Sequence, residues 1–82
     1  MINYQANRWK SAYWRKQTRY YNCELKQNLF GEWVIIRSWG DIRSNKGRQM
    51  EHCCDNFEGA DKLFQQVIKR RQYRKYQLFN EY

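Results

Sequence analysis

The chain has 82 residues, enough for one domain with one small core and too few for a second. Lysines and arginines number 16 against 8 acidic residues, and this net charge of +8 favours a polyanionic partner over a basic surface that only keeps the protein soluble. No apolar run is long enough to cross a bilayer and no leader opens the chain, so we expect a cytoplasmic protein without a membrane partner.

Residues 1–10 are expected to be loose, and a short strand is expected at 12–16. The segment 19–26 alternates strictly, which is typical of a strand with Tyr21, Cys23 and Leu25 on one face. Asparagine and glycine in 27–31 then indicate a turn. The segment 32–39 is rich in β-branched and aromatic residues and predicts the next strand. Its two faces carry Val34, Ile36, Ser38 and Trp33, Ile35, Arg37, Trp39.

A second turn is indicated at 45–47, and a third strand is expected at 48–54. After Asp55 the apolar period changes to three and four, which predicts an amphipathic helix from about residue 58 to 74. Asp55 or Asn56 can cap its start. Its stripe consists of Phe57, Ala60, Phe64, Val67, Ile68 and Arg71.

These elements predict an α+β fold for a single domain, 1–82. The fold is a small twisted antiparallel sheet of three to four strands, with one long C-terminal helix packed on one face. We expect Val34 and Ile36, together with Tyr21, Cys23 and Leu25, to face the helix. The other sheet face would then stay open and present aromatic and arginine side chains that need a partner.

The chain lacks the usual signatures of an enzyme. It has no glycine-rich phosphate loop, and its one histidine, His52, is expected to be a half-buried strand residue. Cys53 and Cys54 are too close together for an unstrained disulfide, so reduced thiols are expected. The spacing of His52, Cys53 and Cys54 also does not suit zinc. We therefore expect no catalytic residue, no metal, no cofactor and no small-molecule substrate.

Several stretches, in order, resemble the WGR domain family, whose small stand-alone members occur in bacteria. Arg19-Tyr20-Tyr21 resembles the family's opening basic-aromatic strand. Leu29-Phe30-Gly31-Glu32-Trp33 resembles the family's Leu-Phe-Gly-x-Trp turn. The family is named for a Trp-Gly-Arg tripeptide. Ile36-Arg37-Ser38-Trp39-Gly40 resembles the residues that lead into and begin this tripeptide, but Asp41 stands in place of its arginine. The helix stripe and Tyr76 fit the family as well, whereas Lys75 stands where the family has glycine.

The resemblance implies DNA binding, at ends or nicks, through a basic aromatic surface. Trp39 would stack on a sugar or base; packing under the helix is its alternative role. Arg43 is a candidate substitute for the missing arginine, because Asp41 would repel phosphate. The candidate nucleic-acid-binding residues are Arg37, Trp39, Gly40, Arg43, Lys46, Arg48 and Arg71. Two alternatives stay open: a protein-interaction module without significant DNA affinity, and single-stranded RNA binding.

Overall fold

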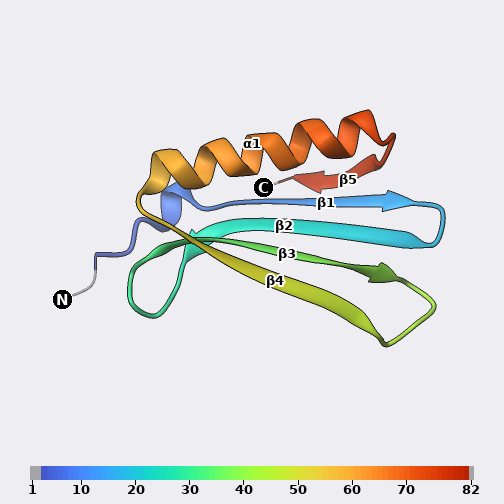
Figure 1. Ribbon diagram of the computed structural model, residues 1–82, viewed down its shortest axis with the longest axis horizontal. Coiled ribbons are helices and arrows are strands. Elements are labelled where there is room, and N and C mark those ends of the chain that lie inside the picture. The colour runs from blue at the N-terminus through green and yellow to red at the C-terminus, as the bar shows by residue number, and fades with distance from the viewer. Residues whose placement is uncertain (1–2, 82) are drawn as a thin grey trace.

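The structure, a computed structural model, describes residues 3–81, and the side chains of residues 3–79. After a short 3-10 helix, η1 (Ala6–Arg8), come β1 (Lys10–Lys16), β2 (Arg19–Gln27), β3 (Trp33–Asp41), β4 (Gly47–Cys54), α1 (Phe57–Tyr73) and β5 (Gln77–Glu81). The strands form one antiparallel sheet in the order β4-β3-β2-β1-β5, and α1 runs along one side of it (Figure 1). The described part of the chain holds no helix long and apolar enough to cross a membrane.

The α+β class is confirmed, but the expectation of three to four strands is wrong, because the sheet has five. The strand that sequence reasoning missed is β5, which lies beyond the helix and pairs with β1 at the opposite end of the chain. Five residues are too few to show a period, and the β1–β5 register shifts between Tyr13 and Trp14. The segment is a strand because it pairs with β1, and its own sequence carries no local pattern that predicts a strand.

The turn that leads into β5 forms with a lysine where glycine is usual. Lys75 has a φ of 62°, in the left-handed region. The Tyr76 amide donates to the Arg71 carbonyl over 3.0 Å, which closes the end of α1 and reverses the chain. The departure of Lys75 from the family pattern therefore leaves the turn in place.

The core lies between α1 and the sheet. Asn56 caps the helix, its side chain accepting from the Gly59 amide over 2.8 Å, and Phe64 is 1% exposed. The core cluster consists of Ala12, Trp14, Tyr21, Cys23, Leu25, Trp33, Ile35, Ala60, Phe64 and Val67. Burial raises the pKa of the Cys23 thiol to about 12, so this core cysteine is neutral.

The sequence separated the two faces of β3 correctly but assigned the wrong one to the helix. Tyr21 lies opposite Trp39 and Leu25 lies opposite Ile35, so these side chains share the helix-facing side. Val34 and Ile36 point to the other side, where Val34 is nonetheless buried. Both faces of this strand are apolar near its start. The alternation of side chains along the strand separates the two faces but does not indicate which of them the helix covers.

The N-terminal segment makes defined contacts with the β2–β3 turn. The Gln5 amide donates to Gln27 Oε1 over 2.6 Å, and the Tyr4 hydroxyl donates to the Leu29 carbonyl over 3.0 Å. The expected looseness of residues 1–10 stays a prediction, and positions 1 and 2 lie outside the described residues.

Candidate functional site

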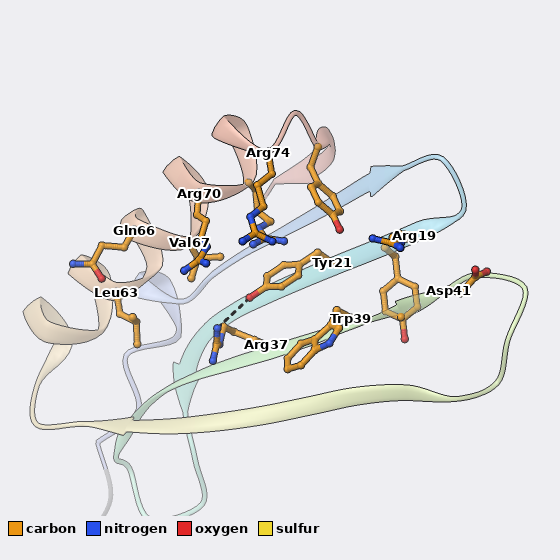
Figure 2. Close-up of a pocket in the computed structure, with 14 residues that line it drawn as sticks. Arg19, Tyr21, Arg37, Trp39, Asp41, Leu63, Gln66, Val67, Arg70 and Arg74 are labelled. Carbon is orange, nitrogen blue, oxygen red and sulfur yellow. Dashed lines mark hydrogen bonds between the residues drawn. The ribbon is translucent and has the colours of Figure 1, made fainter.

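The register of β3 brings Trp39 and Arg37 to the side of the sheet on which α1 lies. There, a cavity of about 740 Å³ opens between α1, mainly its C-terminal half, and the sheet. On the sheet side the cavity is lined by the start of β2 and the end of β3. Figure 2 shows side chains from both walls pointing into it. The lining residues are Arg19, Tyr20, Tyr21, Arg37, Trp39, Gly40, Asp41, Leu63, Gln66, Val67, Arg70, Arg71, Arg74 and Tyr76.

Positive charge dominates this cavity, because five of its lining residues are arginines and one is acidic. The acidic one, Asp41, is already paired. Its carboxylate accepts from Arg43 Nη2 over 3.1 Å, from Arg43 Nε over 3.2 Å and from the Thr18 hydroxyl over 3.3 Å. The Arg43 hydrogen bonds lower the pKa of Asp41 to about 2. The carboxylate therefore neutralises Arg43 rather than an arginine of the cavity.

Arg71 is the most unusual of the five arginines, since it is only 8% exposed. Its guanidinium carbon lies 4.1 Å from the centre of the Tyr21 ring and 4.9 Å from that of Tyr76. Burial lowers its pKa, and its Nε has no hydrogen-bond partner in the described structure. The positive charge of this half-desolvated guanidinium, which two aromatic rings contact, favours an anion nearby.

Trp39 takes a position between its two expected roles. Its ring is stacked on Tyr21, with centroids 6.0 Å apart and planes 14° apart, and it packs against the core cluster. The side chain is nevertheless only half-buried and lines the cavity. Tyr21 thus supports one side of an indole that keeps part of its surface accessible for stacking (Figure 2).

Of the residues expected from the sequence, the structure gathers Arg37, Trp39, Gly40 and Arg71 around the cavity. Arg43, Lys46 and Arg48 are exposed on the β3–β4 hairpin and do not line it. Arg43 lies against Asp41, so its role as a substitute for the missing family arginine stays a prediction.

Sequence reasoning left out three arginines of the cavity. Arg70 and Arg74 belong to the basic run at the end of α1, which also suits the helix dipole, so the run alone did not single them out. Arg19 is the first residue of β2, and no local pattern marks it as a binding residue. It lies at the cavity because β2 pairs with β3 there, with Arg19 opposite Asp41.

The fold and the cavity together define a class: a small α+β module that presents a cationic, aromatic pocket at one end of its helix. The particular family follows from comparison. A model of the WGR domain matches residues 5–81, and the chain therefore belongs to the WGR family. Domains of this family are non-catalytic modules known for nucleic-acid binding in proteins related to poly(ADP-ribose) polymerases.

One curated relative matches with significance. It is the uncharacterized protein y4dW of Sinorhizobium fredii, 36% identical over 62 residues, which are 76% of this chain and 30% of that protein. The chain thus spans under a third of the length of the relative. No solved structure matches significantly.

Proposed function

We propose that this protein binds DNA through the arginine-rich cavity, with a preference for strand ends or nicks. The observation that carries the proposal is the charge balance of the cavity. Five arginines line it, and its one acidic lining residue is occupied by Arg43, outside the lining. Phosphate diesters supply the missing anions, and a guanidinium fork matches phosphate oxygens.

The preference for ends follows from the size of the cavity. A space of about 740 Å³ suits a molecule of drug or nucleotide size. We expect a terminal or displaced nucleotide, and not the interior of a duplex, to enter a space of this size. Trp39, supported by Tyr21, offers a flat surface for its sugar or base, and Arg70 and Arg74, which line the same cavity, can pair with its phosphates.

The decisive experiment is fluorescence anisotropy with blunt, nicked and circular duplexes and with single-stranded DNA and RNA. Affinity should fall steeply between about 50 and 200 mM salt, because phosphate contacts release counterions. Ends and nicks should compete better than closed circles. No binding at low salt would remove the proposal, and stronger binding of RNA would transfer it to single-stranded RNA.

Matched variants in the last turn of α1 and at its C-cap connect binding to the cavity. Arg70→Gln and Arg74→Gln each remove an exposed lining arginine and should lower affinity and flatten the salt slope by about one unit. Lys69→Gln removes the same charge from an exposed neighbour outside the lining. Equal losses in all three variants would show that only the total charge matters.

The family departure gives a further test. Asp41→Arg removes a carboxylate from the cavity wall and frees Arg43, so DNA binding should tighten. Asp41→Asn is the control that removes the charge but adds no donor fork. If Asp41→Arg leaves affinity unchanged, the loop after Gly40 does not face DNA.

The alternative is a protein-interaction module, and one observation favours it. Leu29 and Phe30 are 84% and 79% exposed at the β2–β3 turn, and Tyr4 lies beside them. Exposed apolar side chains that cluster in this way are typical of protein contacts. Tight, salt-dependent DNA binding by a Leu29→Ser, Phe30→Ser variant would separate the DNA function from this surface.

A further inference from the structure

The only histidine of the chain, His52, contacts an arginine of the cavity. His52 Nε2 lies 2.8 Å from Arg37 Nη2. A guanidinium has donors and no acceptor, so the imidazole must accept at Nε2. The geometry therefore requires a neutral His52 that carries its proton on Nδ1. Protonation at Nε2 would replace this hydrogen bond with two cations in contact.

Arg37 has few other polar partners in the described structure. Its Nη1 donates to the Tyr21 hydroxyl over a long 3.5 Å, its Nη2 lies 3.6 Å from Met50 Sδ, and its Nε is buried without a partner. No carboxylate among the described residues forms an ion pair with it. Among the residues that the structure describes, His52 Nε2 is thus the acceptor closest to the Arg37 guanidinium.

Most ionisable groups on this side of the sheet are neutral or cationic. The nearby carboxylates are Asp41, which lines the cavity and is paired with Arg43, and Asp55, which follows β4 and acts on Cys54. On β2 they are Tyr21 and Cys23, the latter neutral because burial raises its pKa to about 12. On β4 they are Arg48 and Cys54, whose pKa burial also raises. Arg70 and Arg71 of α1 and the C-cap residue Arg74 line the same cavity. Glu51 points to the opposite side of the sheet.

We propose that binding of DNA phosphate in the cavity is coupled to protonation of His52. The proposal rests on the proposed function and adds its regulation by pH. A phosphate beside Arg37 gives the guanidinium a stronger acceptor than imidazole, so Arg37 no longer requires the His52 lone pair. The same phosphate favours a second cation nearby. Phosphate and proton therefore stabilise each other at this site, by reciprocal linkage.

The sign of the effect follows. Protonated His52 is unfavourable beside Arg37 in the free protein and favourable once phosphate is present. Binding takes up a proton, so affinity rises as pH falls. One coupled proton can change affinity by at most about tenfold per pH unit. We expect affinity for a blunt duplex at about pH 6 to exceed that at about pH 8 by roughly threefold to tenfold.

The test compares wild-type protein with His52→Gln at constant ionic strength across this pH range. The glutamine oxygen can accept from Arg37, so the contact is kept while the proton site is lost. His52→Gln should bind like wild type at the upper pH and show little dependence on pH. Arg37→Lys is the second variant: it keeps the charge, loses the fork, and should change the size of the pH effect.

The outcomes separate the two proposals. No DNA binding at any pH overturns both of them. Binding with the same pH dependence in wild type and His52→Gln overturns the coupling alone, and so does calorimetry in buffers of different ionisation enthalpy that detects no proton uptake. Nitrogen NMR of the free protein tests the geometry without DNA: a proton on Nε2 at neutral pH would contradict it.

Discussion

The phenol of Tyr20 lies across Gly40, the glycine of the Trp-Gly step. A Cβ built on Gly40 would stand 2.9 Å from the Tyr20 hydroxyl oxygen and 3.1 Å from its ring carbons. Gly47, the partner of Gly40 on β4, is covered by the same hydroxyl, closer still. A side chain at Gly40 would therefore have to displace the outer end of the Tyr20 ring, and glycine leaves that ring its place.

Gly40→Ala should destabilise the protein by roughly 1–3 kcal/mol, because the extra methyl group has to displace the ring. Thermal unfolding measures the loss. The same substitution in a Tyr20→Ala background should cost much less, since the obstacle is gone. Equal costs in both backgrounds would mean that the contact with Tyr20 is not the reason for the glycine.

Phe64→Ala should be severely destabilising. The side chain is 1% exposed between α1 and the sheet. Truncation of a buried phenylalanine costs roughly 3–5 kcal/mol. Phe30→Ala is the matched control, because its side chain is 79% exposed. Chemical denaturation of both variants would contradict the assignment of the core if their midpoints shifted equally.

Lys75→Gly should stabilise the protein by about 0.5–1 kcal/mol, because glycine adopts the left-handed region without a Cβ penalty. Lys69→Gly makes the same chemical change on the exposed side of α1 and should cost about 1 kcal/mol. Opposite signs in thermal unfolding are expected. A loss of stability in both variants would show that the backbone of Lys75 is not strained.

The Asp41–Arg43 pair should make the β3–β4 hairpin sensitive to acid. The pKa of Asp41 is lowered from an ordinary 3.8 to about 2, so its stabilising effect is complete above the ordinary value and is lost as pH falls towards 2. The stability difference between wild type and Asp41→Asn should shrink over that interval. A constant difference down to pH 2 would show that charge does not stabilise this turn.

The sequence by itself determined the elements that local patterns specify. Alternation predicted β2, β-branched and aromatic content predicted β3, and the turn before it indicated β4, each to within a residue or two. Apolar spacing predicted α1 to within one residue. Asn28 and Gly31 specified the β2–β3 turn, where Gly31 has a φ of 79°. The family followed from Trp39, Gly40 and their neighbours, because motif order is itself a property of sequence.

Only the tertiary structure decided how these elements face one another. Both faces of β3 can be buried, so the contact of Trp39 with Tyr21 depended on the docking side of the helix. The strand β5 exists through its pairing with β1. The cavity joins Arg19, Arg37 and Arg70 from three elements, and a local pattern carries no information about distances between them.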